Sequence, residues 1–215
     1  CVADAATKVV ALPSSFAPAL RIKCTKGVLP VTAHLSVPPF PKAAEGTARP
    51  MMARIRKAQV EDCRKIAEIM RDRSDIAFTD VDAITSRLQK NGFGEDPVFI
   101  SFLAEDDDAA GASRIIGYAM VSRIYSTWQG KSLRLGDLYI VADRRRQGVG
   151  TDLLRTVMKA CQEQGCARID CCPQLANTAL ISFLEKHGAC NIAAQDGWCY
   201  YQLAHEDMLK LAGQA

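Results

Sequence analysis

A short basic turn, Arg145 to Gly150, constrains this chain more than any other feature of its sequence. Leu135 to Val141 before it has the composition of a buried strand, and Thr151 to Gln164 after it has the apolar spacing of an amphipathic helix. Gly148 and Gly150 have no Cβ, so backbone N–H groups at the turn can approach a phosphate closely. The free N–H groups at the start of the helix point to the same place. The turn therefore predicts a site for a phosphorylated cofactor.

The spacing within this turn excludes two common phosphate-binding motifs. Neither the dinucleotide fingerprint G-x-G-x-x-G nor the P-loop G-x-x-x-x-G-K-[ST] occurs in the chain. The pattern present is Arg-x-x-Gly-x-Gly, which begins at Arg145. A solvated basic turn without a ligand is the alternative interpretation, but it does not explain why the glycines stand directly at the helix start.

Charge is distributed unevenly along the 215 residues. Residues 1–50 carry six basic and two acidic side chains, a charge of +4, so that residues 51–215 carry −1 of the total of +3. Because the body of the chain is close to neutral, a nucleic-acid partner is not expected. Residues 1–50 also contain seven prolines and no sustained periodicity. We interpret them as a disordered tail, a mistranslated or artificial leader, or an organelle-targeting remnant, and expect the folded domain at 51–215.

The nine cysteines do not have the pattern of a disulfide scaffold. Their number is odd, no C-x-x-C pair occurs, and the three histidines are widely separated, so no metal site is expected. Buried free thiols in a reducing compartment explain them better. No apolar run is long enough to span a bilayer. We therefore expect a cytoplasmic protein with no membrane partner.

Strand and helix patterns alternate from residue 53 onward. The acidic run Glu105 to Asp108 is interpreted as a solvated hairpin loop, and the order of elements predicts an α+β fold with a mixed, mostly antiparallel twisted sheet flanked by helices. The predicted strands are Arg54–Arg56, Phe99–Ala104, Ile115–Tyr125, Leu133–Ala142, Ala167–Cys172 and Trp198–Leu203. The predicted helices are Val60–Arg73, Val81–Gln89, Thr151–Gln164, one that Asn177 caps and that ends before Gly188, and Glu206–Leu211.

The basic glycine turn, in its strand–turn–helix setting, resembles the pyrophosphate loop of the GCN5-related N-acetyltransferase superfamily, which binds acetyl-CoA. Four further segments resemble the diamine (spermidine/spermine) and thialysine acetyltransferases, namely Asn91–Pro97, Tyr125–Lys131, Leu135–Ile140 and Gly197–Trp198. The resemblance implies the fold of that superfamily and a homodimer. It also implies direct transfer of an acetyl group to the primary amine of a small cationic substrate, which is a polyamine, a diamine or a lysine-like amino acid.

The resemblance also implies roles for individual residues. Asp137 would attract the amine and help to remove its proton, Tyr139 is a second catalytic candidate, and Trp128 and Asp196 would contact the substrate; a surface carboxylate is the alternative for each aspartate. The cofactor would be held by the backbone of Leu138, Tyr139 and Ile140, by the loop residues Arg145, Arg146, Gln147, Gly148, Val149, Gly150 and Thr151, and by Asn177.

Three departures from the family pattern bear on catalysis. Gly136 stands where the family has a glutamate, Leu184 where it has the tyrosine that protonates the CoA thiolate, and Ala176 where it has a tryptophan. Because a positioned acid contributes about 10²–10⁴-fold to a rate, its loss would slow the reaction. Tyr139, Cys172 or Tyr200 could replace it. The departures leave open an acyl-CoA-binding pseudoenzyme or interaction subunit and, less favoured, an enzyme acting on peptide amines.

For two other features we prefer a structural interpretation to a catalytic one. The adjacent Cys171 and Cys172 suggest an acyl-enzyme, but no basic neighbour that would activate a thiol is evident in the sequence, so a packed core pair is expected. His187, next to Gly188, is expected to be a favourable charge at a helix end or a packing residue rather than a base.

Overall fold

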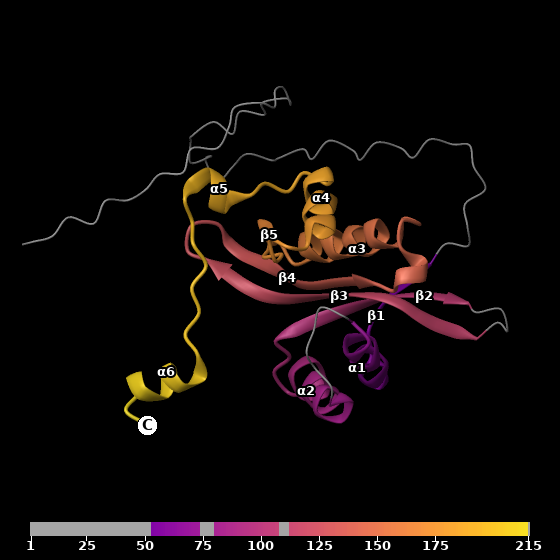
Figure 1. Ribbon diagram of the computed structural model, residues 1–215, viewed down its shortest axis with the longest axis horizontal. Helices are drawn as coiled ribbons and strands as arrows, with labels where there is room; N and C mark the ends of the chain where they lie inside the picture. Colours follow the sequence, from indigo (N-terminus) through magenta and orange to yellow (C-terminus); the bar gives the residue numbers. More distant parts are fainter. Residues whose placement is uncertain (1–52, 74–79, 108–111, 215) are drawn as a thin grey trace, which may run out of the picture. The chain divides into compact units, whose positions relative to one another are not determined.

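A five-stranded sheet organises the chain. The computed structural model describes residues 53–73, 80–107 and 112–214. The strands are β1 (Arg54–Lys57), β2 (Phe99–Asp107), β3 (Ser113–Ser126), β4 (Gly130–Ile140) and β5 (Arg168–Cys171), in the spatial order β1-β2-β3-β4-β5 (Figure 1). The first four are antiparallel neighbours, and β5 is parallel to β4. The predicted α+β fold with a mixed, mostly antiparallel sheet is confirmed.

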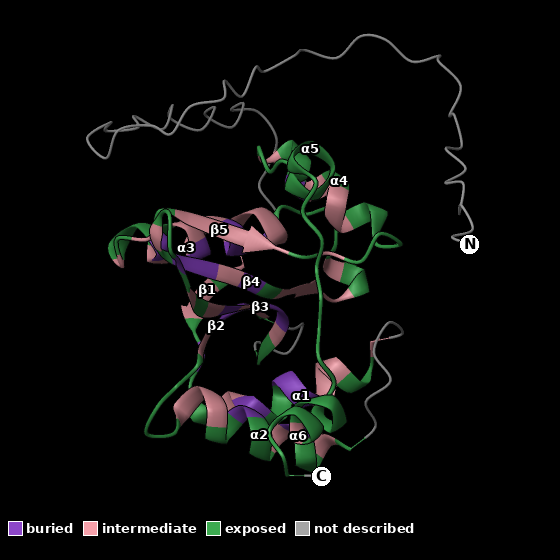
Figure 2. Ribbon diagram, turned by 90° about the vertical axis from the view of Figure 1, so that its left-hand side faces the viewer, coloured by how far each residue is buried: buried purple, intermediate pink, exposed green. Residues whose placement is uncertain are grey.

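Helices cover both faces of this sheet. On one face lie α1 (Cys63–Arg71), which follows a 3-10 turn at Val60–Asp62, and α2 (Val81–Phe93). On the other face lie α3 (Val149–Glu163) and α4 (Thr178–Lys186). Two short helices complete the described chain, α5 (Ile192–Asp196) and α6 (His205–Leu211). The buried residues form one core on each face of the sheet, and Figure 2 shows them concentrated on the strands, α1, α2 and α3.

Helix α3 illustrates how the sequence produces one of these cores. Leu153, Leu154, Val157 and Cys161 recur at helical spacing and are each at most 5% exposed. Burial of a side chain of this size contributes about 1.5–3 kcal/mol. The helix ends as predicted before Gly165, whose φ of +66° allows the N–H of Cys166 to donate to the carbonyl of Cys161 at 3.0 Å.

Helix α2 extends past its predicted end. The prediction took Asn91-Gly92 as a stop, yet the helix continues to Phe93. A Cβ at position 92 would lie 2.5 Å from the ring of Phe99 on β2. The glycine is therefore required by close packing of the helix on the sheet, and the prediction that it ends the helix is wrong.

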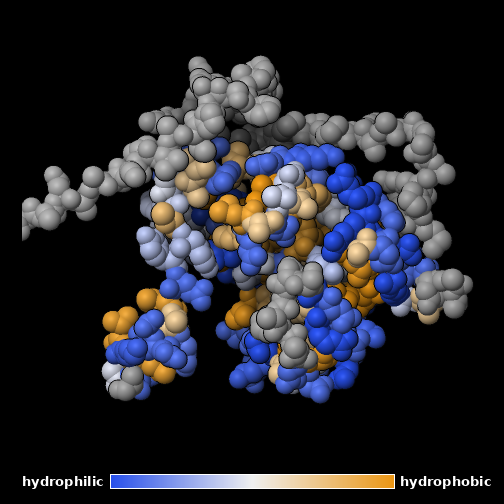
Figure 3. Space-filling model, in the orientation of Figure 1, coloured by the Kyte–Doolittle hydropathy of each residue, from blue (hydrophilic) through white to orange (hydrophobic). Residues whose placement is uncertain are grey.

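The predicted closing strand Trp198–Leu203 is also wrong. These residues are described, but they have no sheet partner and are exposed. Instead, Asn191 caps α5 by accepting from the N–H of Ala194, and Gly197 ends that helix with a φ of +72°. Figures 2 and 3 show the segment that follows as exposed, with hydrophobic side chains on the surface of α6.

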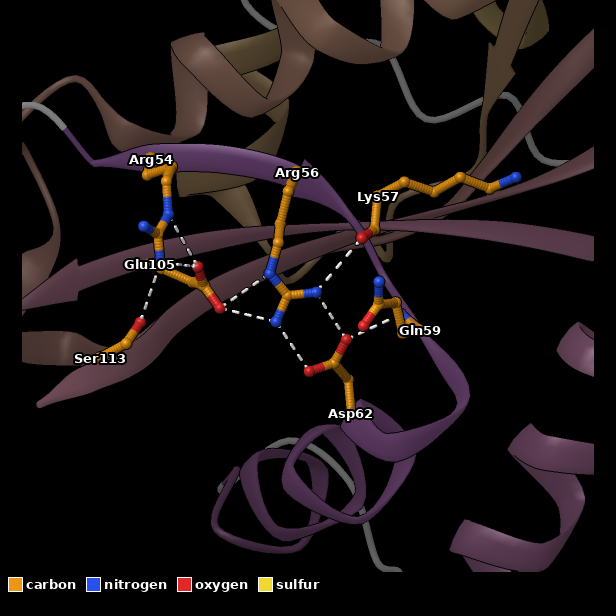
Figure 4. Close-up of polar contacts among 7 residues, drawn as sticks. All are labelled: Arg54, Arg56, Lys57, Gln59, Asp62, Glu105 and Ser113. Atoms are coloured by element: carbon orange, nitrogen blue, oxygen red, sulfur yellow. Dashed lines mark hydrogen bonds and ion pairs between the residues drawn. The ribbon is translucent and has the colours of Figure 1, made fainter.

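The acidic run Glu105 to Asp108 is not the solvated hairpin loop that was predicted. Glu105 lies within β2 and is 6% exposed, and Asp108 lies outside the described residues. The Glu105 carboxylate accepts from the guanidinium groups of Arg54 (2.7 Å) and Arg56 (2.6 Å), and Arg56 also pairs with Asp62 at 2.7 Å (Figure 4). Arg56 thus ties β1 to β2 and to the turn that precedes α1.

We expect Arg56→Met to lower the free energy of unfolding by about 2 kcal/mol at pH 7, because it leaves the buried Glu105 with a single, exposed partner. Hydrogen bonds from Arg56 lower the pKa of both Asp62 and Glu105. A carboxyl whose folded pKa is depressed stabilises the protein at neutral pH and loses that contribution as the pH falls through the folded value. Urea unfolding should therefore show that the free energy of unfolding falls less between pH 7 and pH 3 in Arg56→Met than in the wild type.

Arg64→Met is the matched control for this variant. Arg64 pairs with Asp82 at 2.8 Å, but the two side chains are 62% and 81% exposed. Such an exposed pair contributes at most about 1 kcal/mol. Equal losses of stability in the two variants would contradict the assigned role of Arg56.

The boundary expected at residue 50 lies outside the described residues. None of the helices within the described ranges is both long and apolar enough to cross a membrane. No group of three or more His, Cys, Asp or Glu side chains that could hold a metal ion occurs among the described residues.

Candidate active site

Gly136 forms a β-bulge in the middle of β4. The register with β3 pairs Leu135 with Val121 and Asp137 with Met120, so Gly136 has no partner on that strand. The extra residue changes the phase of the strand. Leu135 before it packs in the α3 core, whereas Asp137 after it contacts Tyr118, which is buried in the core on the α1–α2 face. The bulge therefore turns the Asp137 side chain toward α1.

The two central strands separate just after the bulge. Pairing between β4 and β5 runs from Ser132–Arg168 to Leu135–Cys171 and then ends, although β4 continues to Ile140. Val141 donates its N–H to Ile116 of β3 at 2.9 Å. Because backbone groups alternate between the two sides of an antiparallel strand, the N–H groups of Leu138 and Ile140 face the opened edge. The Tyr139 N–H, by the same alternation, faces β3.

The basic glycine turn lies at the end of this opened edge. A 3-10 turn, Ala142–Arg144, separates it from β4, so the turn does not follow the strand directly as predicted. Arg146 and Gly148 have φ values of +63° and +90°. A backbone with such left-handed residues directs successive N–H groups to one side. Within the described chain, the N–H groups of residues 146–150 donate no hydrogen bond. A Cβ added to Gly148 would meet no atom within 4 Å.

The first turn of α3 is held between β4 and α4. A Cβ at Gly150 would contact the Phe183 ring at 3.7 Å and Ile140 at 3.9 Å, so all three elements meet there. Thr151 Oγ1 lies 3.3 Å from His187 Nε2, and His187 Nδ1 lies 2.7 Å from the carbonyl of Phe183. A carbonyl can only accept, so Nδ1 donates to it, and Nε2 shares a hydrogen bond with the Thr151 hydroxyl. His187 therefore links α4 to the first turn of α3, which corresponds to the packing role, one of the two predicted for it.

On the opposite face of β4, Asp137 belongs to a half-buried polar cluster. Its Oδ2 accepts from Arg73 Nη1 at 2.5 Å and from the Tyr118 hydroxyl at 2.6 Å, and Arg73 Nη1 also donates to that hydroxyl at 2.8 Å. Burial and then the Asp137 charge raise the pKa of Tyr118 far above its ordinary value, so it remains a donor. Among described residues, no donor contacts Asp137 Oδ1.

Tyr139 lies between two guanidinium groups. Arg73 is 4.6 Å and Arg145 5.3 Å from the centroid of its ring, and Arg145 Nε also donates to the Ile140 carbonyl at 2.9 Å. Tyr139 further lines a cavity of about 600 Å³ together with Val141, side chains of α1 and the start of β3. The catalytic candidates Asp137 and Tyr139 are therefore brought together on the side of β4 that faces α1.

These features, an opened strand edge beside a glycine turn with free N–H groups, agree with the comparisons to known proteins. Residues 63–189 match the Acetyltransferase (GNAT) family. The chain belongs to the GNAT acetyltransferase family. The resemblance stated from the sequence is thus confirmed, and acetyl transfer is the activity of that family.

Relatives of this GNAT acetyltransferase include enzymes named for small amines. A thialysine N-epsilon-acetyltransferase from Mus musculus is 30% identical over 166 residues, which cover 75% of this chain and 98% of that protein. The spermidine/spermine N(1)-acetyltransferase-like protein 1 from Homo sapiens is 25% identical over 162 residues, which cover 74% of this chain and 23% of that protein. An integron cassette protein from V. cholerae has the same fold, with a TM-score of 0.62 at 18% identity over 76% of this chain and 99% of that one.

The GNAT structure does not bring all of the predicted substrate residues together. Trp128 lies in the turn between β3 and β4, and Asp137 lies about 23 Å along β4 from Gly130, the first residue after that turn, at about 3.3 Å per residue. The Trp128 ring is 6.0 Å from that of Trp198, and Asp196 ends α5 two residues earlier. Within one chain, Trp128 and Asp196 therefore gather at one end of β4 and Asp137 lies toward the other.

Other sequence candidates have structural positions that limit their roles. Leu184 is 7% exposed in the core beside α3, and Tyr200 is 70% exposed. Asn177 caps α4 by accepting from the N–H of Leu180 at 3.1 Å. Arg73 and Tyr118 were missed in the sequence, because neither spacing nor composition indicates that an arginine after α1 meets a tyrosine of β3.

Proposed function

We propose that this GNAT acetyltransferase moves the acetyl group of acetyl-CoA to the primary amine of a small cationic molecule by direct transfer. The observation that carries the proposal is that a candidate cofactor site and a candidate acceptor site lie next to each other on β4. The free N–H groups of residues 146–150 and the opened edge lie at the end of the strand, and Asp137 and Tyr139 lie on its α1 side.

The residues of the turn fit acetyl-CoA. Five adjacent N–H groups, which donate to no described residue, lie beside a helix N-terminus and next to exposed Arg146, and they match the charge and size of a diphosphate. The N–H groups of Leu138 and Ile140 would hold the pantetheine arm and the acyl carbonyl. Acetyl-CoA, when bound, supplies the activated acyl group. The Leu138 N–H then acts as an oxyanion donor of the kind that removes about 3–4 kcal/mol from an acyl-transfer barrier.

Asp137 is positioned to attract the amine rather than to act alone as a strong base. One of its oxygens is occupied by Arg73 and Tyr118, while Oδ1 remains available for a substrate ammonium. We therefore expect the proton to leave through water, with Tyr139 as the nearest hydroxyl on β4. The cavity beside Tyr139 provides room for the rest of the acceptor.

Direct transfer is favoured over an acyl-enzyme. Burial raises the pKa of Cys171 to about 11, so only a trace of its thiolate exists at neutral pH. Cys172, its neighbour, is exposed after β5, and no described residue activates it.

A coupled assay tests the proposal. The full chain is incubated with acetyl-CoA and, separately, lysine, thialysine, putrescine, spermidine and a lysine peptide, while thiol release and the mass of the acetylated product are recorded. We expect transfer to at least one small amine and little to the peptide. Calorimetric binding of acetyl-CoA without transfer to any amine would favour the pseudoenzyme, and transfer to the peptide alone would favour a protein substrate.

We also propose a homodimer, as the resemblance implies. The C-terminal segment supports it, because six of its large apolar side chains are exposed by 48–89% and its residues pair with no strand in the described part of the chain. An exposed set of this size is unusual for a monomer. Each copy would offer an unpaired segment and the open edge of β5, so that a two-fold pair satisfies both. The six side chains are Trp198, Tyr200, Tyr201, Leu203, Met208 and Leu211.

Light scattering after size-exclusion chromatography tests the homodimer. The full chain should have twice the mass of the monomer, and a variant that ends at Gly197 should have the mass of one chain. A dimer that survives this truncation would show that the C-terminal segment is not the interface.

A further inference from the structure

We propose that Tyr118 is a positioning residue for acetyl transfer, one that fixes the Asp137 carboxylate in the acceptor site without touching the acceptor. This inference rests on the proposed function, in which Asp137 attracts the amine. Tyr118 is 0% exposed and belongs to the core on the α1–α2 face of the sheet. Its hydroxyl nevertheless donates to Asp137 Oδ2 at 2.6 Å, and Asp137 is half-buried. The phenol therefore reaches the site from inside the core.

The register of the two central strands places Tyr118 beside Asp137. Tyr118 pairs with Tyr139 and Met120 pairs with Asp137, so Tyr118 and Asp137 are diagonal neighbours on one face of the sheet. Diagonal neighbours lie about 7–8 Å apart, a distance that an aromatic side chain can span. The Tyr118 ring also lies 6.2 Å from the Tyr139 ring, within the range of an aromatic pair. One core side chain thus contacts both catalytic candidates of β4.

Asp137 needs such a support because β4 has lost one neighbour at this point. The bulge at Gly136 precedes it, and pairing with β5 ends at Leu135. Tyr118, by contrast, lies on a strand that is paired on both sides, with Leu103 of β2 and with β4. A functional group is held precisely when its supporting side chain is locked by packing on a rigid element.

Arg73, the other partner of Asp137, is a less rigid support. It follows α1, which ends at Arg71, and an arginine side chain has more rotatable bonds to fix than a tyrosine side chain. Arg73 Nη1 donates to the Tyr118 hydroxyl at 2.8 Å, and that hydroxyl gives its one proton to Asp137. Burial and then the Asp137 charge raise the pKa of Tyr118, so the donor keeps its proton at neutral pH.

Tyr118→Phe removes this hydroxyl and keeps the ring. The full chain is assayed with acetyl-CoA and whichever of lysine, thialysine, putrescine and spermidine the wild type acetylates fastest. We expect the variant to have a higher KM for the amine and a kcat/KM for the amine lowered at least about tenfold. The KM for acetyl-CoA should stay within about twofold, because Tyr118 contacts the acceptor side of β4. A smaller folded fraction would lower kcat alone, so the amine KM separates positioning from a structural role.

A double-mutant cycle with Asp137→Ala shows whether Tyr118 acts through Asp137. Residues that act as one unit have effects that do not add. Adding Tyr118→Phe to Asp137→Ala should therefore change kcat/KM for the amine less than about twofold, although the same substitution lowers it at least about tenfold in the wild type.

Tyr125→Phe is the matched control, since it removes the same atom from a residue of the same strand that is 75% exposed. It should leave all three constants unchanged. Equal losses from Tyr118→Phe in the wild type and in Asp137→Ala, or an unchanged amine KM in Tyr118→Phe, would overturn the inference and leave the proposed function intact. A wild type that acetylates none of the four amines would overturn both.

Discussion

Replacing Gly148 with valine is expected to lower the affinity of the enzyme for acetyl-CoA at least about 100-fold. Gly148 has a φ of +90°, a conformation that a β-branched residue avoids. To relieve this strain the turn must change shape, and its N–H groups then lose their common direction. A hydrogen bond to a charged group contributes about 1.5–3 kcal/mol, so the loss of two accounts for the expected factor. Isothermal titration calorimetry with acetyl-CoA measures it.

Gly165→Val is the matched control for this variant. Gly165 also has a positive φ, +66°, and a Cβ there would likewise meet no atom within 4 Å, but it ends α3 far along the chain from the turn. Both variants should lose a similar stability in thermal unfolding, because both carry the same kind of backbone strain. Only Gly148→Val should lose acetyl-CoA. Unchanged binding in Gly148→Val would remove the main support for the assignment of the turn.

The features that sequence reasoning predicted well depend on residues close together in the chain. The turn at Arg145 to Gly150, the apolar face of α3 and the cap at Asn177 each follow from local spacing, and the structure has all three. The mixed, mostly antiparallel sheet was also predicted, and the neighbours β2, β3 and β4 are consecutive antiparallel strands that follow each other closely in the chain.

The features that were missed depend on contacts between distant residues. Glu105 was predicted to be a loop residue because an acidic run is usually solvated. Its burial is explained by its ion pairs with the arginines of β1, above all with Arg56. The pairing of Asp137 with Arg73 joins residues 64 positions apart. The strand predicted at Trp198–Leu203 has the right composition but pairs with no strand among the described residues. No local pattern carries this information.

One missed feature did have a local signal. In β4 the apolar residues alternate as Leu133 and Leu135, and then the phase shifts by one to Leu138 and Ile140. A glycine stands at the point of the shift, which is typical of a β-bulge. The sequence pattern was interpreted as one regular strand over Leu133–Ala142. A regular strand would have placed Asp137 on the same face as Leu135, in the α3 core.

Deletion of Gly136 is expected to reduce acetyl transfer at least about 100-fold while the protein remains folded. The deletion leaves Leu135 opposite Val121 and Asp137 opposite Met120, so every side chain keeps its face and the ladder becomes regular. A regular β4 loses the kink and the added twist of the bulge and can continue to pair with β5 beyond Cys171. The opened edge that presents the N–H groups of Leu138 and Ile140 then closes.

Gly136→Ala separates the bulge from the identity of its residue. Its φ is not positive, and a Cβ there would lie 3.7 Å from the carbonyl oxygen of Met120, an ordinary contact, so this variant should keep activity within about threefold. Circular dichroism, thermal unfolding and thiol release are compared for both variants. An active deletion variant would show that the bulge is not needed for the opened edge. An unfolded deletion variant would show that β4 cannot pair with β3 in a regular register and needs the extra residue of the bulge.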